Sequence, residues 1–149
     1  MRLVIDSNIF VSSLDPKDYF HSECYPIFEK LLNFEIESIC PVIVLVETIC
    51  ALRRRTNSEE IANEYYRNLV ILPSINWLDV NLELAEKACM LGARTGLKGG
   101  DAIILQVAEQ YGVPILTKDK EIKDKAPMGI IVFEPEELKK WNLLLSMGD

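Results

Sequence analysis

Apolar and polar positions divide the chain into two kinds of segment. Short runs rich in β-branched or aromatic residues predict strands at residues 3–5, 36–40, 77–80, 115–117 and 130–133. Longer segments with apolar residues every three or four positions predict helices at residues 22–34, 41–53, from 58 onward, 81–94, 101–111 and 135–145. Strands that alternate with helices are typical of a parallel sheet covered by helices. We therefore expect an α/β fold of three layers built from five strand–helix units.

The predicted helices have ordinary boundary signals. Pro41 suits the first position of a helix with an apolar face of Val42, Leu45, Val46, Ile49 and Leu52. Ser58 and Asn81 are predicted N-caps, since short polar side chains accept hydrogen bonds from the first helical amides. Gly112 and Pro114 end the helix that contains Asp101, and Pro135 begins the last one.

Length and composition indicate one globular unit. The 149 residues contain no Pro/Gly/Ser-rich linker and no repeat, so we expect a single domain over residues 1–149. No apolar run reaches the roughly 18 residues that cross a bilayer, and the apolar start stops at Asp6, too early for a signal peptide. We expect a soluble, cytoplasmic protein without membrane contact. The widely spaced Cys24, Cys40, Cys50 and Cys89 are predicted to be reduced core residues.

Glu47 is an acid inside the apolar stretch PVIVLVETICAL, residues 41–52. An ionised carboxylate in an apolar interior is costly unless it is neutralised, paired or bound to a metal. Asp6 and Asp119 follow predicted strands, and Asp101 begins a predicted helix. Ligands of open parallel sheets bind beyond the carboxyl ends of the strands, so all four acids can face one cleft.

A cluster made only of carboxylates favours magnesium or manganese, because these ions prefer oxygen ligands. Zinc would want histidines and thiols, and the chain has a single histidine. A divalent ion can orient a phosphate, withdraw charge from it and activate a water, so the pattern indicates phosphodiester hydrolysis. It would also explain Glu47, whose carboxylate would point into a metal-bearing pocket.

Each acid also has a simpler structural explanation when it is taken alone. Asp6 can be a turn residue in the DSN sequence, and Asp101 can be a helix cap or a partner of the helix dipole. Asp119 can be one charge in the solvated run TKDKEIKDK. For Glu47 the alternative is a buried ion pair. The joint placement of the four acids favours the functional interpretation.

Four motifs resemble those of the PIN domain family, and in particular the VapC-type ribonuclease toxins of prokaryotic toxin–antitoxin systems. In chain order they are LVIDSNIFV, PVIVLVETICAL, GGDAIILQVAEQYG and PILTKDKEI, and together they span nearly the whole chain. The resemblance implies a five-stranded parallel sheet between helices. It implies that Asp6 and Asp101 are the principal metal ligands, and that Asp119 is a further ligand, directly or through water. Glu47 would be a ligand or would orient the water on the metal.

The resemblance also implies an activity and partners. The family usually cleaves single-stranded RNA with metal-activated water, leaving a 5′-phosphate and a 3′-hydroxyl, and its toxin members form homodimers and bind an antitoxin. Ser7, Asn8 and Thr117 match small polar positions beside the family's acids. The fourth motif often carries a second acid, for which Glu121 or Asp124 is the candidate here. The number of metal ions, one or two, stays open.

RNA contacts would have to come from local cations, because the formal net charge of −7 argues against a protein that coats nucleic acid. The candidates flank the acids: Arg53, Arg54, Arg55, Arg94, Lys98, Lys118 and Lys120. For the three consecutive arginines, we prefer interaction with a helix dipole over RNA contact. His21 receives no role. Trp77 and Trp141 are expected in the core or at an interface rather than stacked on bases.

Several alternative functions were weighed. A haloacid-dehalogenase phosphatase would need an acid where Asn8 stands, a receiver domain would need paired acids after the first strand, and no glycine-rich phosphate loop occurs. Two alternatives stay open: a PIN-domain nuclease in RNA processing or DNA metabolism without an antitoxin, and a weakly active PIN scaffold that binds proteins. The apolar face around Ile27, Phe28, Leu31 and Leu32 is either core or a groove for a second copy or an antitoxin.

Overall fold

The structure is a computed structural model that describes the backbone of residues 1–146 and the side chains of residues 1–140. Its strands are β1 (Arg2–Ile5), β2 (Glu37–Pro41), β3 (Ile75–Leu78), β4 (Ile115–Leu116) and β5 (Val132–Phe133). They form one sheet in the order β3-β2-β1-β4-β5, and every pair of neighbours is parallel. The predicted five-stranded sheet is confirmed. The strand order reverses at β1, which pairs with β2 on one side and β4 on the other.

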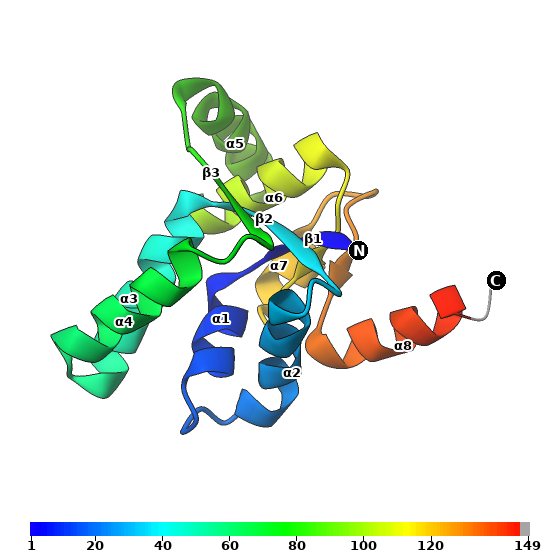
Figure 1. The fold of residues 1–149 in the computed structure, drawn as a ribbon. Helices are drawn as coiled ribbons and strands as arrows, with labels where there is room; N and C mark the ends of the chain where they lie inside the picture. Colours follow the sequence, from blue (N-terminus) through cyan, green and yellow to red (C-terminus); the bar gives the residue numbers. More distant parts are fainter. Residues whose placement is uncertain (147–149) are drawn as a thin grey trace.

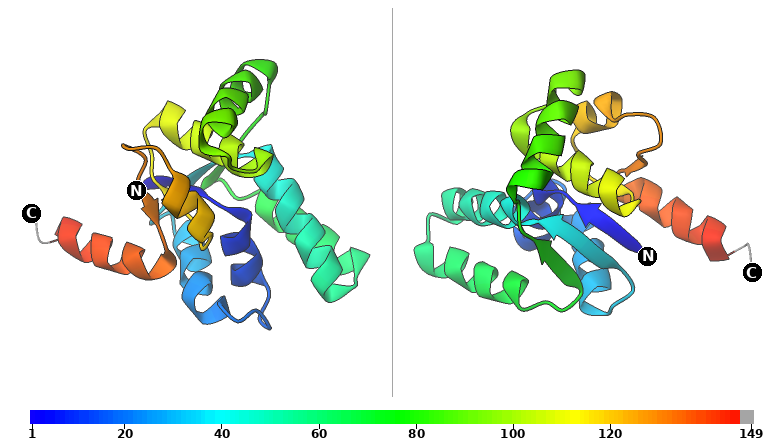
Figure 2. Two further views of the ribbon diagram at one scale, coloured as in Figure 1. Left: turned by 180° about the vertical axis from the view of Figure 1, so that it is seen from behind. Right: turned by 90° about the horizontal axis from the view of Figure 1, so that it is seen from above.

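The helices of the described residues are α1 (Ser7–Leu14), α2 (His21–Leu32), α3 (Val42–Thr56), α4 (Glu59–Val70), α5 (Leu82–Thr95), α6 (Gly99–Tyr111), α7 (Lys120–Lys125) and α8 (Pro135–Ser146). Helices α5 and α6 pack together on one side of the sheet, and α1, α2 and the α3–α4 pair lie on the other (Figures 1 and 2). This is the expected three-layer arrangement. Helix α8 contacts β5 and α2 and then extends away from the body (Figure 1).

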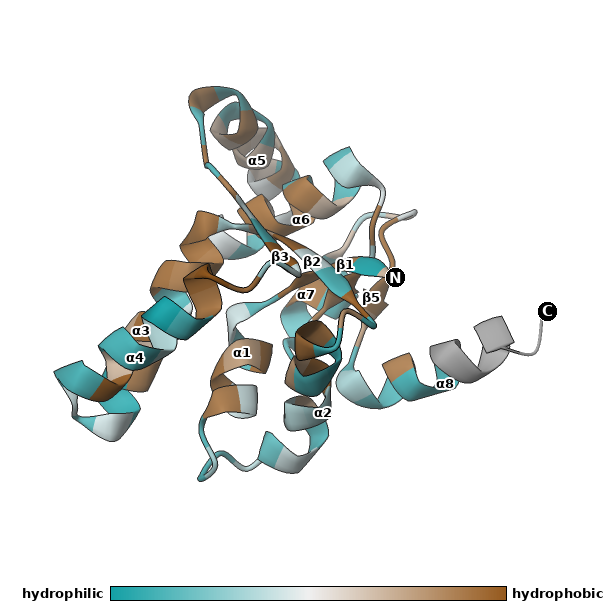
Figure 3. Cartoon of the chain, viewed as in Figure 1, coloured by the Kyte–Doolittle hydropathy of each residue, from teal (hydrophilic) through white to brown (hydrophobic). Residues whose placement is uncertain are grey.

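The core lies between the central strands and the helices that cover them. Leu3, Val4 and Ile5 of β1 are at most 1% exposed, because this strand is covered on both faces. Ile104 and Leu105 of α6 pack into the same core cluster. In Figure 3 the central strands and the first half of α3 are mainly apolar, whereas α4 is mostly hydrophilic. In the described part of the chain, no helix combines the length and apolarity that a membrane crossing requires.

Two helices were not predicted from the sequence. Helix α1 begins directly after Asp6, whose carboxylate accepts a hydrogen bond from the Ser7 amide at 2.7 Å. The DSN sequence is therefore a helix start rather than a simple turn. Helix α7 is capped in the same way by Asp119, which accepts from the Glu121 amide at 2.8 Å. Both helices are short, with eight and six residues, so their apolar periodicity was too brief to read.

The caps of the longer helices are as predicted. The Ser58 hydroxyl accepts from the Ile61 amide, and the Asn81 side chain accepts from the Leu84 amide. Gly112 ends α6 in the left-handed conformation, at φ 62°, which favours glycine. Pro41 is the N-cap of α3 rather than its first helical residue.

The predicted apolar face of α3 is only partly correct: Leu52 is buried and the half-buried Leu45 and Ile49 pack against the core, but Val44 and Thr48 were not predicted to be buried. The buried residues of this helix are Val44, Thr48 and Leu52, while Val46 is 55% exposed. The helix packs against β2, α1 and α4, so its apolar residues serve several neighbours rather than one stripe. Glu47 is accordingly half-buried rather than enclosed in an apolar interior.

The cysteine prediction is correct for two residues and wrong for the other two. Cys24 and Cys40 are buried, and burial raises the pKa of the Cys40 thiol to about 12. Cys50 and Cys89 are exposed on α3 and α5. All four are free thiols.

The α2 face is mostly core. Ile27 and Leu31 are buried, whereas Leu32 is 46% exposed. Trp77 is half-buried against Phe10, with ring centroids 6.1 Å apart, which agrees with the expectation of a core residue. The side chain of Trp141 lies outside the described residues.

Candidate active site

The four predicted acids come from four separate segments. Asp6 directly follows β1, and Asp119 lies three residues beyond Leu116, the end of β4. These two strands are neighbours, so their carboxyl ends meet at the reversal of strand order, where ligands of open α/β sheets bind. Asp101 is in the first turn of α6, and Glu47 is on α3. The charges of Asp6, Asp119 and Glu47 all act on Asp101, so the structure brings the four acids together.

Asp6 is held by a dense set of hydrogen bonds. Its side chain is buried, at 4% exposure. Its Oδ2 accepts from the Thr117 hydroxyl at 2.7 Å and from Asn8 Nδ2 at 3.0 Å, while Oδ1 accepts from the Ser7 amide. A carboxylate offers about four lone-pair positions. Oδ1 also lies 3.4 Å from the Ser7 hydroxyl, so both oxygens of Asp6 have two donors nearby.

Thr117 is the centre of this network. It is 1% exposed and donates to Asp6, and its oxygen accepts from the Asp119 amide at 3.0 Å and from Asn8 Nδ2 at 3.1 Å. Asn8 Oδ1 in turn accepts from the Lys118 amide at 3.2 Å. These bonds join the segment after β1 to the segment after β4. The small polar residues named from the sequence therefore fix the backbone that carries Asp6 and Asp119.

Glu47 reaches the same place from α3. The Ser7 hydroxyl donates to Glu47 Oε2 at 2.8 Å, which orients the carboxylate. Its other oxygen, Oε1, lies against Gly100, where an added Cβ would be only 2.7 Å away. A Cβ at the neighbouring Gly99 would meet nothing within 4 Å. Glycine at position 100 thus leaves the space in which the Glu47 carboxylate sits, next to Asp101.

Asp101 has the most unusual surroundings of the four. Among the described residues, its Oδ2 is buried without a hydrogen-bond partner, which is rare in proteins. Burial, followed by the charges of Asp6, Asp119 and Glu47, raises the pKa of Asp101 to about 6. Lys98 opposes this shift but does not cancel it.

The pKa of Asp6 is raised as well. Burial is the largest cause, the hydrogen bonds from Thr117 and Ser7 act in the opposite direction, and Glu47 and Asp119 raise it further. Two acids of the cluster thus resist ionisation in the folded protein. Like charges at close range and loss of hydration both favour the protonated form. Among the side chains that the structure describes, no cation forms an ion pair with any of the four acids.

The chemistry of this cluster fits a divalent cation. Carboxylate oxygens are preferred ligands of Mg²⁺ and Mn²⁺, and an orphaned buried oxygen beside three other acids is a place where a cation lowers the free energy. Within residues 1–140, no three His, Cys, Asp or Glu side chains already stand in an arrangement that could hold a metal ion. Binding would therefore draw the carboxylates closer than they are in this structure.

The candidate second acids of the fourth motif lie on α7. Glu121 pairs with Lys125, with Oε1 and Nζ 2.8 Å apart, and this hydrogen bond lowers the pKa of Glu121. Asp124 is exposed. Asp119 itself caps α7, because its Oδ1 accepts a hydrogen bond from the Glu121 amide.

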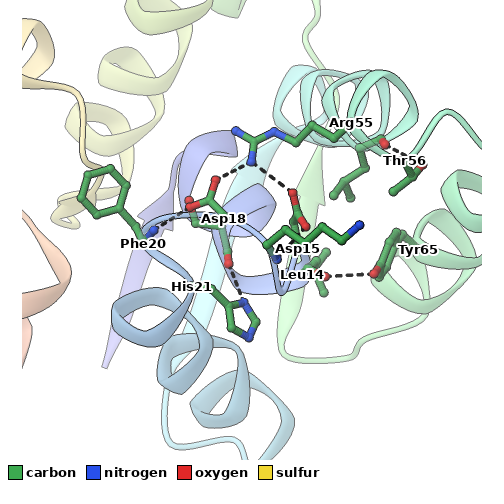
Figure 4. Close-up of polar contacts among 11 residues, drawn as sticks. Leu14, Asp15, Asp18, Phe20, His21, Arg55, Thr56 and Tyr65 are labelled. Carbon is green, nitrogen blue, oxygen red and sulfur yellow. Dashed lines mark hydrogen bonds and ion pairs between the residues drawn. The ribbon is translucent and has the colours of Figure 1, made fainter.

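The cations named from the sequence have different surroundings. Lys118 pairs with Glu23 at 2.6 Å, and its ammonium lies 3.8 Å from the centroid of the Phe20 ring. Arg55 forms ion pairs with Asp15, at 3.2 Å, and with Asp18, and it fixes the α1–α2 loop to α3 (Figure 4). These ion pairs, in addition to the expected interaction with the helix dipole, give Arg55 a structural role. Lys98 and Lys120 are exposed.

His21 has a structural contact, in line with its lack of an assigned role. Its Nδ1 lies 2.8 Å from the Ser12 carbonyl oxygen (Figure 4).

A groove of about 520 Å³ lies beside the acids. Its lining includes Ser7 and Asp119 from the site and Tyr19, Phe20 and Arg55 from the surrounding elements. Sequence reasoning missed Tyr19 and Phe20, because two aromatic residues in a short loop show no periodicity. A second hollow of about 560 Å³ lies between Arg55 and Tyr65 and shares no residue with the acidic cluster.

The fold, together with the acids at the place where the strand order reverses, defines a class of α/β protein with a carboxylate site at the end of β1. The PIN domain family model matches residues 3–127, and the chain belongs to this family. The family predicted from the four motifs is thereby confirmed. A search of curated proteins gives no significant match.

Solved structures share the fold at low sequence identity. VapC20 from Mycobacterium tuberculosis, described as a Sarcin-Ricin loop cleaving toxin, has a TM-score of 0.72 and 16% identity, over 87% of this chain and 98% of that one. A toxin–antitoxin complex from Klebsiella pneumoniae has a TM-score of 0.65 and 20% identity, over 89% of this chain and 97% of that one. FitAcB from Neisseria gonorrhoeae has a TM-score of 0.65 and 19% identity, over 91% of this chain and 98% of that one.

Proposed function

We propose that this chain is an endoribonuclease that uses Mg²⁺ or Mn²⁺ to hydrolyse RNA phosphodiester bonds, and that it is the toxin of a toxin–antitoxin pair. The observation that carries the proposal is the convergence of four acids that form no ion pair with a described side chain, with one buried Asp101 oxygen unpartnered and the pKa of Asp101 raised to about 6. Membership of the PIN family and the likeness to the VapC20 toxin support it.

In this proposal Asp6 and Asp101 are the principal ligands, Asp119 is a further ligand, and Glu47 is a ligand or orients the attacking water. A divalent cation held there supplies Lewis acidity toward a phosphate oxygen and a water of lowered pKa. The chain's own contribution is to hold the ligands. Thr117 and Asn8 fix Asp6, and the Ser7 hydroxyl fixes Glu47.

The raised pKa values give the site a second property. Asp101 holds a proton more readily than a free aspartate, and a cation would displace that proton. Metal affinity should therefore fall as the pH drops through about 6. The buried surroundings that raise the pKa also strengthen the attraction between the carboxylates and a cation.

The proposed partners follow from the same comparisons. The Klebsiella pneumoniae structure is a toxin–antitoxin complex, which supports an antitoxin partner for this chain. We further propose a homodimer and a cytoplasmic location. We also propose that residues 1–149 form one PIN domain. A small gene for a DNA-binding protein immediately upstream would support the antitoxin, and an isolated gene would count against it.

The test of the activity compares RNA cleavage by the wild type, Asp101→Asn and the control Asp79→Asn. Asp79 is an exposed acid after β3. We expect the wild type and the control to cut RNA with Mg²⁺ or Mn²⁺, leaving 5′-phosphates, and to stop when a chelator is added. Asp101→Asn should be inactive while its circular dichroism matches the wild type. A folded, metal-supplied wild type that cuts nothing from a broad RNA panel would overturn the proposal.

A further inference from the structure

The groove beside the acids opens directly onto the proposed site. It shares Ser7, Asn8 and Asp119 with that site and runs along the loop between α1 and α2. Its volume of about 520 Å³ is within the range of roughly 300–1,000 Å³ typical of ligand pockets. A molecule bound in this groove would touch both the acidic residues and the loop.

One wall of the groove is an aromatic pair. Tyr19 is 88% exposed, which is unusual for a large aromatic side chain. Its ring meets Phe20 edge to face, with centroids 4.9 Å apart and an interplanar angle of 89°. Phe20 in turn lies under the Lys118 ammonium, and Lys118 is the residue before Asp119. Tyr19 is therefore supported on one side and open to solvent on the other.

The loop that carries this pair is held in place. Asp18 accepts a hydrogen bond from the Phe20 amide at 2.8 Å and pairs with Arg55 of α3 (Figure 4). An aromatic ring on a fixed loop loses little conformational entropy when a flat ligand stacks on it.

The same groove contains two cations with spare donors. Arg55 makes both of its ion pairs through Nη1, and a guanidinium has five N–H donors, so Nη2 and Nε can still donate to a phosphate. Lys118 uses one of its three N–H donors on Glu23. Exposed aromatic rings combined with cations are the elements that bind single-stranded nucleic acid.

We propose that this groove binds one unstacked nucleotide of single-stranded RNA next to the phosphate that is cut, with the base on Tyr19 and phosphates near Arg55 and Lys118. The inference rests on the proposed ribonuclease function and adds to it a base-stacking subsite at Tyr19. A base in a duplex is stacked on its neighbours and cannot reach the ring, so duplex RNA should be excluded.

The test measures binding of a fluorescently labelled single-stranded RNA ten-mer by anisotropy, with Mg²⁺. The parent is Asp101→Asn, which should not cut the probe. Tyr19→Ala, Tyr19→Phe and Tyr66→Ala are each added to it. Tyr66 is a 44% exposed tyrosine on α4 outside the groove. Because Tyr19 is itself so exposed, its removal should leave folding unchanged, which circular dichroism checks.

We expect Tyr19→Ala to weaken RNA binding by about 5- to 150-fold, the range that base–aromatic stacking gives. Tyr19→Phe keeps the ring and should bind like the parent, as should Tyr66→Ala. A duplex of the same sequence should bind weakly and should not respond to Tyr19→Ala. Equal affinity of Tyr19→Ala and Tyr66→Ala would overturn the inference, and so would a parent that binds DNA but not RNA.

The proposed function can fail independently. If the wild type cuts RNA but Tyr19→Ala binds normally, the nuclease stands and the stacking subsite is refuted. If Tyr19→Ala loses binding while the wild type cuts no RNA, the subsite stands and the ribonuclease is refuted.

Discussion

Two groups of acids lie close to helix α3, and they differ in their charge balance. Asp15 and Asp18 flank the α1–α2 loop and pair with Arg55 near the end of α3. Asp6, Asp101 and Asp119 surround Glu47, which is eight residues earlier on the same helix. The first group contains its own cation. In the second group no described side chain forms an ion pair with an acid, although the charge of Lys98 acts on Asp101.

The pKa shifts follow this difference. Burial raises the pKa of Asp18, but the hydrogen bonds from Arg55 and the Phe20 amide outweigh it, so the net shift is downward. Burial and neighbouring acids raise the pKa of Asp101 to about 6. A cluster of acids therefore does not by itself indicate a metal site, because the same residue types can be paired with a cation of the protein. Ion pairing distinguishes the two groups: acids paired with Arg55 hold the fold together, whereas acids without an ion pair among the described residues could hold an external ion.

The largest expected effect comes from the network that fixes Asp6. Thr117→Val removes the donor to Asp6 and the acceptor for the Asp119 amide. We expect metal affinity or RNA cleavage to fall by about 10- to 100-fold, as for other residues that orient metal ligands. Unfolding free energy should fall by about 1–3 kcal/mol, because buried polar groups lose partners.

Thr48→Val is the matched control for Thr117→Val. Thr48 is fully buried as well, but its hydroxyl donates to the Val44 carbonyl within α3. This variant should cleave RNA normally. Equal losses of cleavage in the two variants would show that the Thr117 network has no particular role at the site.

The next effect concerns the space for the Glu47 carboxylate. A Cβ at Gly100 would lie 2.7 Å from Glu47 Oε1, whereas a Cβ at Gly99 would meet nothing within 4 Å. Both glycine-to-alanine changes should stabilise α6, by about 0.5–1 kcal/mol where no strain opposes it. Gly100→Ala should also reduce cleavage roughly tenfold, because Glu47 must move away from its place beside Asp101. If Gly99→Ala reduces cleavage as much as Gly100→Ala does, displacement of the Glu47 carboxylate is not the cause of the loss.

Stability should depend on pH in opposite directions for the two groups of acids. The raised pKa of Asp101 means that its ionisation is disfavoured in the folded protein, so the penalty is absent below about pH 4, develops between about 4 and 6, and is complete above. Asp101→Asn avoids this penalty. Without metal at pH 8, it should raise unfolding free energy by on the order of 1–2 kcal/mol, allowing for solvent screening. Urea unfolding at pH 8 and pH 4 measures the difference, which should nearly vanish at pH 4.

The smallest effect is expected at the ion-paired group. Arg55→Gln should lower unfolding free energy by about 1 kcal/mol at pH 7, since the arginine side chain is partly exposed. The lowered pKa of Asp18 means that its contribution is present above about pH 4 and is lost at lower pH. The difference between Arg55→Gln and the wild type should therefore shrink on acidification. Arg53→Gln, which loses one exposed bond to Asn57, is the control and should change stability little.

The sequence predicted the parallel sheet and the main helices because their periods are long enough to read. It also named the four acids: Asp6, Asp101 and Asp119 stand next to a predicted strand end or helix start, and Glu47 interrupts an apolar stretch. It did not predict α1 or α7, which are too short to show a period. For α3 it predicted the burial of Leu52 but missed that of Val44 and Thr48, because three different elements pack on that helix.

Contacts between residues far apart in the sequence were also not predicted. The Thr117–Asp6 bond joins residues 111 positions apart, and the Arg55–Asp18 ion pair joins residues 37 apart. No local pattern encodes such pairs. The resemblance placed Thr117 beside the acids, but no sequence pattern indicated that Tyr19 stands at the edge of the site.

The measurement that tests the central claim most directly is thermal unfolding of the wild type and Asp101→Asn during titration with Mn²⁺ at pH 8. An ion that binds only the folded protein stabilises it by RT ln(1 + [L]/Kd), about 2.7 kcal/mol at 100 times Kd. We expect a saturable rise in the Tm of the wild type and of the control Asp79→Asn, with little rise for Asp101→Asn. An unchanged Tm for the wild type, or an equal rise for Asp101→Asn, would contradict a cation site at the acidic cluster.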